Sequence, residues 1–164
     1  MTSLNHVINS AFKKIIKLKI MTMLFRFINP EVEPVNSIRP RRLMNAYEYE
    51  KFIHDDIDLG VAIGNHLNGL VEDSPFISLT TDWTLAAQTT DTSPGGLGSI
   101  VHHAPNIAVF DVPKQYIYHA GTGLQESEGE VLVLLPPGQS LSQYLINVIA
   151  NGYMGVYWNA HNLE

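Results

Sequence analysis

Three alternating glutamates lead straight into an uninterrupted apolar run that ends at two prolines. Residues 126–130 (Glu-Ser-Glu-Gly-Glu) are followed by residues 131–135 (Val-Leu-Val-Leu-Leu) and by Pro-Pro at 136–137. Such a run predicts a strand covered on both faces, which the prolines end. Since strand side chains alternate, Glu128 and Glu130 are expected on one face, roughly 7 Å apart. Glu130 then stands at the mouth of a core strand, where a carboxylate is costly unless it is paired or used.

The whole chain has the size and composition of one globular domain. Its 164 residues are 45% hydrophobic and 16% charged, which allows a sizeable core. It contains no cysteine, so disulfides and thiolate metal sites are excluded. Residues 1–42 hold eight of the ten Lys and Arg and two acids, a net of +6, whereas residues 43–164 carry a net of −12. The acidic body argues against nucleic acid as a partner, because that binding needs a cationic surface.

The N-terminal segment, residues 1–20, is basic and has apolar residues at helical spacing between four lysines. This spacing predicts an amphipathic helix. The lysines exclude a transmembrane span, and they follow the apolar start, unlike the order in a signal peptide. The helix either packs on the domain, lies on a membrane surface or binds a partner. Residues 21–164 then form the folded domain.

The segment Met21–Ile28 predicts a buried strand with one charged residue, Arg26. Alternation puts Arg26 on one face together with Leu24 and Ile28. An arginine in such a strand needs an anion close by. Either a carboxylate of the protein forms a salt bridge with it, or its guanidinium holds the phosphate of a ligand.

A second short strand is expected at 76–80 (Phe-Ile-Ser-Leu-Thr). Its alternation puts Phe76, Ser78 and Thr80 on one face. Thr81 then has the position of a helix N-cap. Two hydroxyls just before a helix N-terminus suit a pocket for a polar ligand.

The remaining elements predict an α+β fold. Helices are expected over 44–57 and from Ser140 or Ser142 through Ile149, while 60–70 is left open between helix and loop. Strands are expected at 107–112 and within 115–119.

Two further groups of polar residues show no specific pattern. Arg39, Arg41 and Arg42 are interpreted as a solvated cluster in a proline-punctuated loop. The seven histidines include no pair at helical i, i+4 spacing with a nearby acid, so no metal site is predicted.

In chain order these pieces resemble the arginine–serine–glutamate class of mono-ADP-ribosyltransferases, the group that contains cholera-toxin-like bacterial toxins. Residues 24–26 (Leu-Phe-Arg) resemble the first-strand motif of that family. Residues 76–80 resemble its Ser-Thr-Ser strand, with Ser78 at the first serine position and departures at the other two. Residues 128–131 (Glu-Gly-Glu-Val) resemble its Glu-x-Glu motif. The resemblance covers about residues 21–155.

The resemblance implies a catalytic domain over 21–164, with two packed, mainly antiparallel sheets flanked by helices. It implies NAD as substrate and no metal. Arg26 would hold the NAD phosphates, and Ser78 would orient Glu130. Glu130 would stabilise the positive charge that develops as the nicotinamide bond breaks, as carboxylates do in glycoside hydrolysis. Glu128 would orient or deprotonate the acceptor, and a glutamate there implies arginine as the acceptor.

Further contacts follow from the same resemblance. Phe76 and Thr80 are expected beside Ser78 as NAD-binding residues. Tyr116 and Tyr118 are expected to contact the target in a recognition loop at 115–129.

As a toxin or effector of this class, the protein would be secreted or delivered into a target cell and would act in the cytosol. Its partners would be a target protein of a host or competitor and a cognate immunity protein. The nearest alternative is an NAD glycohydrolase on the same scaffold, in which water replaces the acceptor. A second alternative is a non-catalytic binding module in which Arg26 and Glu130 only pair with each other.

Overall fold

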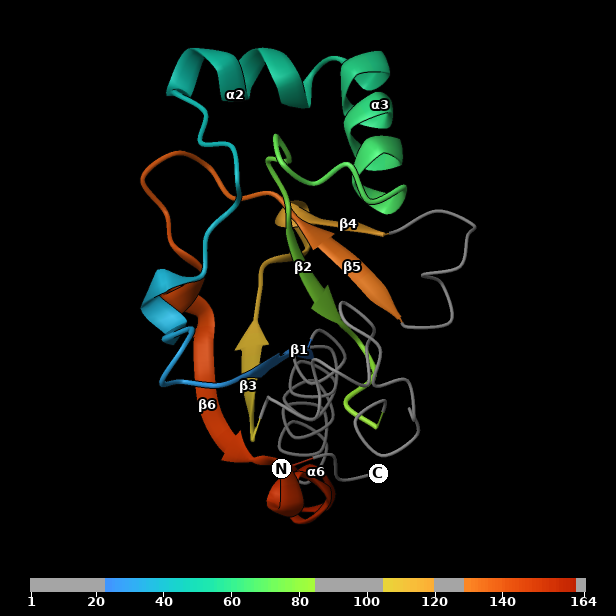
Figure 1. Ribbon diagram of the computed structural model, residues 1–164. Coiled ribbons are helices and arrows are strands. Elements are labelled where there is room, and N and C mark those ends of the chain that lie inside the picture. The colour runs from blue at the N-terminus through green and yellow to red at the C-terminus, as the bar shows by residue number, and fades with distance from the viewer. Residues whose placement is uncertain (1–22, 85–104, 120–128, 162–164) are drawn as a thin grey trace, which may run out of the picture.

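The computed structural model describes residues 23–84, 105–119 and 129–161, and an antiparallel sheet forms its centre (Figure 1). Six strands form this sheet in the order β4-β5-β2-β1-β3-β6. They are β1 (Met23–Ile28), β2 (Ile77–Thr80), β3 (Asn106–Asp111), β4 (Ile117–His119), β5 (Glu130–Val133) and β6 (Leu145–Ala150).

The sheet has two halves, β4-β5-β2 and β1-β3-β6, which meet at one register pair, Phe25 with Thr80. Every strand pairing in it is antiparallel. The predicted α+β class is therefore confirmed. The division into two packed sheets is not confirmed, because the described strands form one hydrogen-bonded sheet.

Three α-helices are described: α2 (Ala46–Ile53), α3 (Asp56–Leu67) and α6 (Met154–His161). In Figure 1, α2 and α3 lie together at one end of the molecule and α6 lies at the other. Short 3₁₀ helices connect elements at η1 (Val35–Ser37), η2 (Lys114–Tyr116), η4 (Leu141–Tyr144) and η5 (Asn151–Tyr153).

The helical segment after residue 44 is two helices instead of the single predicted one. Asn45 and Glu48 form a capping box at the start of α2. The Asp55 carboxylate then accepts hydrogen bonds from the next backbone N–H groups and begins α3. The segment 60–70, which the sequence left open, is helical through Leu67.

The predicted helix ending at Ile149 is wrong. After η4 the chain forms β6, which pairs with β3 along the edge of the sheet. Its run of Leu-Ile-Asn-Val-Ile is rich in β-branched residues, which favour a strand when a partner edge is present. The last helix is α6, and it buries Met154 completely.

The core consists of three apolar clusters. The central cluster joins both halves of the sheet and includes Leu24, Ile77, Leu79, Phe110, Val131, Val133 and Leu141. The aromatic cluster lies beside α6 and includes Phe25, Phe27, Ile107, Val109, Met154, Trp83 and Trp158. The helix-side cluster places Phe76, Leu132 and Leu134 against half-buried residues of α2 and α3.

Candidate functional site

Ser78 and Glu130 meet across the neighbouring strands β2 and β5. Thr80 on β2 is the register partner of Glu130 on β5. Ser78 lies two residues before Thr80, so its side chain is on the same face of the sheet and diagonally opposite Glu130. The Ser78 hydroxyl donates a hydrogen bond to Glu130 Oε1 at 2.8 Å. The structure therefore brings together two residues that are 52 positions apart in the sequence.

Gly129 fixes the start of β5 against the end of β2. Its φ of +59° lies in the left-handed region, and a Cβ at this position would come within 2.6 Å of Thr81 Oγ1. Its carbonyl accepts hydrogen bonds from Thr81 N at 3.0 Å and from Thr81 Oγ1 at 3.3 Å. Thr81 thus clamps the residue before Glu130, while the helix that it is predicted to cap lies outside the described residues from residue 85 on. A glycine between the motif's two glutamates is required by this close approach.

His66, in the last turn of α3, contacts both of these strand residues. Its Nε2 lies 2.7 Å from Ser78 Oγ and 3.7 Å from Glu130 Oε1. Its Nδ1 lies 2.5 Å from the hydroxyl oxygen of Ser74, and its ring packs edge-on against Phe76. Only 8% of its side chain is exposed. Sequence reasoning missed this residue. The signal that would have found it is its place in the apolar spacing of α3, where Leu59, Ala62, Ile63 and His66 recur at helical intervals.

The number of protons on each side chain determines which group donates in the hydrogen bonds that link His66, Ser78 and Glu130. The single hydroxyl proton of Ser78 goes to the Glu130 carboxylate, so Ser78 Oγ accepts from His66 Nε2. The Nε2 atom must then carry a proton. On the other side, His66 Nδ1 lies within hydrogen-bond distance of Ser74 Oγ, which also accepts from the backbone N–H of Phe76. The order Ser74–His66–Ser78–Glu130 is a continuous polar chain from helix to strand.

The neighbouring groups of Glu130 lower the pKa of its carboxyl group. Burial of the carboxyl group acts to raise that pKa, but the contacts with His66 and Ser78 and the attraction of a charged His66 outweigh burial. The carboxylate, whose side chain is 15% exposed, is therefore kept ionised and held in one orientation. An ionised, oriented and half-shielded carboxylate suits the stabilisation of a developing positive charge.

Arg26 reaches the same serine from β1. Its Nη1 donates to the Ser78 carbonyl oxygen at 3.0 Å. Its Nε and Nη2 donate to the two carboxylate oxygens of Glu33, at 3.2 and 2.7 Å. The sequence left open whether Arg26 pairs with a carboxylate of the protein or with the phosphate of a ligand. The structure shows a carboxylate of the protein, that of Glu33. The binding-module alternative expects Arg26 to pair with Glu130. In the structure Arg26 pairs with Glu33 instead, and Glu130 lies beside His66.

Two further residues expected to contact NAD have partners within the protein. The ring of Phe76 is 3% exposed and packs against Phe52, His66 and Tyr118. The Thr80 hydroxyl accepts a hydrogen bond from the backbone N–H of Asp82 at 3.1 Å. That both contact NAD stays a prediction.

The two tyrosines expected in a recognition loop lie in ordered elements. Tyr116 belongs to η2 and has its ring 6.4 Å from that of Tyr144. Tyr118 belongs to β4, packs on Phe76, and has its pKa raised by burial. Glu128 and residues 120–127 of the expected loop lie outside the described residues, as do Glu126 and the segment 1–20.

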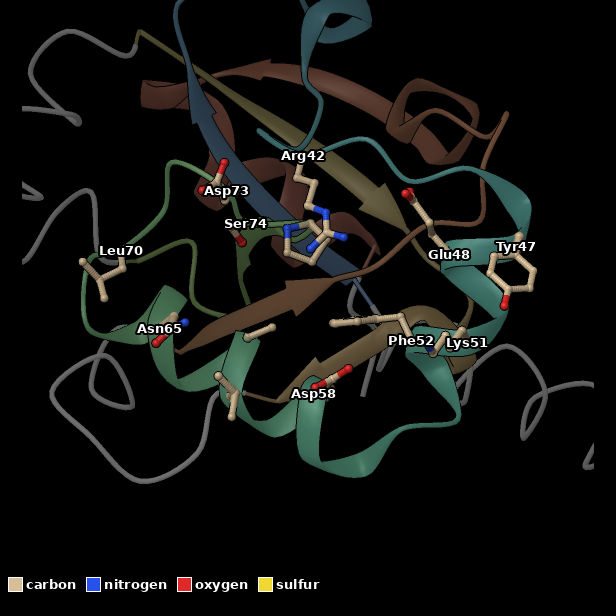
Figure 2. Close-up of a pocket in the computed structure, with 13 residues that line it drawn as sticks. Arg42, Tyr47, Glu48, Lys51, Phe52, Asp58, Asn65, Leu70, Asp73 and Ser74 are labelled. Carbon is tan, nitrogen blue, oxygen red and sulfur yellow. The ribbon is translucent and has the colours of Figure 1, made fainter.

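A cavity of about 530 Å³ lies between α2, α3 and the loop before β2, with Arg42 in its middle (Figure 2). Side chains of both charges line it, among them Lys51 and Asp58. Arg26, Ser78 and Glu130 do not line this cavity, whereas Ser74 does. The polar chain therefore runs from the cavity wall to Glu130.

Within residues 23–84, 105–119 and 129–161, the structure bears on a metal site and on a membrane span. No group of three or more His, Asp or Glu side chains gathers there as a metal-binding set, and the absence of a metal requirement stays a prediction. No helix in those ranges has the length and apolar character needed to cross a bilayer.

No family model matches the chain, and no curated protein or solved structure matches it either.

Proposed function

We propose that the protein is a mono-ADP-ribosyltransferase that uses NAD to modify a side chain, arginine above others, of a target protein. One observation carries the proposal: the Ser78 hydroxyl orients the Glu130 carboxylate while Arg26 binds the carbonyl of the same serine. The arginine, serine and glutamate of the resemblance come from three separate strands and converge on one residue, Ser78. The hydrogen bond from Ser78 to Glu130 supports the proposal, because the resemblance implies this contact.

In the proposed reaction the bond between the nicotinamide nitrogen and the ribose breaks, and nicotinamide leaves with the bonding electrons. The ribose carbon gains positive charge, which the Glu130 carboxylate stabilises. Ser78 and His66 both contact Oε1 of Glu130, and the proposal assigns Oε2 to the nicotinamide ribose. A nitrogen of the acceptor then bonds to the ribose carbon and gives up a proton, for which Glu128 is the proposed base.

Within this mechanism His66 positions the other groups. Because it donates to Ser78 Oγ, the hydroxyl proton of Ser78 is directed at Glu130. His66 is also a neighbour that can carry positive charge, and this keeps Glu130 ionised. The guanidinium donors together with the hydroxyl and the accepting carboxylate fit a ligand that carries phosphates and ribose hydroxyls.

Arg26 has a second task in the proposal, which is to hold the NAD phosphates. Its guanidinium is paired with Glu33 on two nitrogens, and this pair is half-exposed to solvent. A phosphate would displace Glu33, because both anions use the same fork of donors. The remaining donor, Nη1, keeps Arg26 on the Ser78 carbonyl.

On this proposal the protein is a toxin or effector that is secreted or delivered into a cell and acts in the cytosol. Its partners are the target protein and a cognate immunity protein, and membrane contact is assigned to the segment 1–20.

The test uses NAD labelled in its adenosine half, together with a target-cell lysate and a small guanidino compound as acceptors. Label transferred to protein or to the guanidino compound supports the transferase. Release of free ADP-ribose without labelled acceptor instead assigns the NAD glycohydrolase. Absence of both reactions, together with no binding of NAD, overturns the proposal and leaves the binding module.

Variants sharpen that test. Glu130→Ala should lower the rate by about 10²- to 10⁴-fold, the contribution of one positioned catalytic group. Glu72→Ala, which removes an exposed carboxylate that lines neither the first nor any other cavity described, is the matched control and should leave the rate unchanged. Arg26→Ala should weaken NAD binding, and Glu33→Gln should strengthen it by removing the competing carboxylate.

A further inference from the structure

A second cavity, of about 310 Å³, lies between the loop of residues 36–44 and the chain after β5. From the sheet it is lined by Ile77, the neighbour of Ser78 on β2. Since neighbouring strand residues point to opposite faces, this cavity lies on the other side of β2 from the Ser78 hydroxyl. It is thus separate from the candidate site.

The walls of this second cavity are apolar and rigid. Ile38, Ile77, Leu134 and Leu141 lie behind its surface and are at most 4% exposed, so its accessible apolar surface comes from Leu43, Met44 and Leu135 together with prolines. Four prolines line it, and of these Pro40, Pro136 and Pro137 are accessible at its rim while Pro75 is buried. Because proline restricts the backbone, the rim loses little conformational freedom when a ligand binds. The cavity is therefore suited to an apolar group.

The charged residues that line the second cavity are all cationic. They are Arg39 and Arg42, and no acidic residue is part of the lining. Both arginines are exposed, and neither forms an ion pair with another described residue. Arg42 also lines the first cavity, into which its side chain extends (Figure 2), so Arg39 is the cation that belongs to the second cavity alone.

The two cavities differ in the ligand chemistry that they favour. The first mixes cations with the acids Glu48, Asp58 and Asp73. The second combines an apolar interior with positive charge only. An apolar body with an anionic head satisfies both properties of the second cavity at once.

We propose that the second cavity binds a single-chain amphiphile with a carboxylate head. The alkyl chain lies against Met44, Leu135 and Pro136, and the carboxylate lies at the rim beside Arg39, with Arg42 as a weaker second cation. The arginines that the sequence presents as a solvated cluster then have a ligand. This inference does not depend on the proposed ADP-ribosyltransferase activity.

The experiment is calorimetric titration of the full chain with hexanoate, octanoate and decanoate, below the concentrations at which they form micelles. Affinity should rise with chain length by up to roughly fourfold for each added methylene, until the cavity is filled. Decanol and decyltrimethylammonium, which have the same tail without the negative head, should bind more weakly than decanoate.

The arginine cluster supplies its own matched control. Arg39→Gln should weaken decanoate binding by up to roughly fivefold, the scale of an exposed charge pair, and Arg42→Gln by less. Arg41→Gln removes an equal charge from a residue outside the cavity lining and should leave the affinity unchanged. Leu43→Asp, at a rim position that is 71% exposed, should weaken binding without unfolding the protein, because it places a negative charge beside the head group.

Three results would overturn the proposal. The first is equal weakening by Arg41→Gln and Arg39→Gln, which indicates attraction to the general surface charge. The second is equal binding of decanoate and its cationic counterpart. The third is binding of phosphatidylglycerol vesicles without binding of monomeric decanoate, which assigns the arginines to a membrane surface.

Discussion

Helix α6 contributes one wholly buried side chain, that of Met154, to its end of the sheet, whereas α2 and α3 contain no fully buried residue. Beside α6, Phe25 and Met154 have no exposed surface. At the other end, half-buried apolar side chains and the polar chain through His66 connect the helices to β2 and β5. The difference shows that the candidate site lies where the covering helices bury their side chains less completely. At that end, hydrogen bonds among polar side chains help to hold the helices to the sheet, whereas apolar packing does so at the α6 end.

The largest expected effect is at the α6 end. Phe25→Ala removes a ring that is fully buried and packs edge-on against Trp158. The free energy of unfolding should fall by about 3–5 kcal/mol, because a cavity replaces the ring. Urea unfolding followed by circular dichroism measures this loss.

Phe52→Ala is the counterpart at the other end, since this ring is only half-buried and packs on Phe76. Its loss of stability should be clearly smaller than that of Phe25→Ala. Equal losses would show that the two ends are held in the same way, contrary to the comparison.

The second effect is at the polar chain. His66→Ala leaves the Ser74 and Ser78 hydroxyls without their shared partner. Stability should fall by about 1–3 kcal/mol, the range for polar groups left unsatisfied in a buried place. The pKa of Glu130 should also rise, because burial remains while an interaction that lowers the pKa is gone. Urea unfolding and an NMR titration of the Glu130 carboxyl measure the two changes.

His66→Gln separates these roles, since a glutamine amide can donate to Ser78 from near the position of Nε2. It should recover part of both losses. If His66→Ala changed stability while leaving the Glu130 pKa unaltered, His66 would be a packing residue only.

A smaller effect is expected at the start of α3. The Asp55 carboxylate accepts from Ile57 N at 3.1 Å and from Asp58 N at 3.0 Å. Asp55→Ala should reduce stability by about 1 kcal/mol, as is typical of a lost N-cap. Asp56→Asn is the control, because this exposed acid contributes only a few tenths of a kcal/mol through the helix dipole. Thermal unfolding of both variants makes the comparison.

The smallest effect is in the pH dependence of stability. The folded protein holds the pKa of Glu130 below that of the unfolded chain, which is about 4.3. The resulting stabilisation is complete above that value and is lost as the pH falls through the lowered pKa. The stability advantage of the wild type over Glu130→Gln should therefore shrink on acidification. Urea unfolding at a series of pH values tests this, and an advantage that grows with acidity would contradict the assigned direction.

The strands that carry the candidate residues could be predicted from the sequence because their patterns are local. Arg26, Ser78 and Glu130 each stand in a short apolar run whose alternation and proline or glycine ends are readable. The helix expected to end at Ile149 failed for the opposite reason. The same apolar residues suit a helix or a strand, and the free edge of β3 decided between them.

The partners of those residues were not readable in the same way. His66 and Glu33 carry no motif, and nothing local indicates that one would meet Ser78 and the other Arg26. Such contacts depend on how α3 and the loop after β1 pack against the sheet. Side chains far apart in the chain then come within hydrogen-bond distance.

The sequence by itself determined the α+β class and the candidate arginine, serine and glutamate, because residue type and alternation act over a few positions. Only the tertiary structure decided that Ser78 is the shared partner of Arg26, His66 and Glu130. It also decided which arginines line a cavity. The physical reason is that hydrogen bonds and cavities act over a few ångströms in space, whatever the separation along the chain.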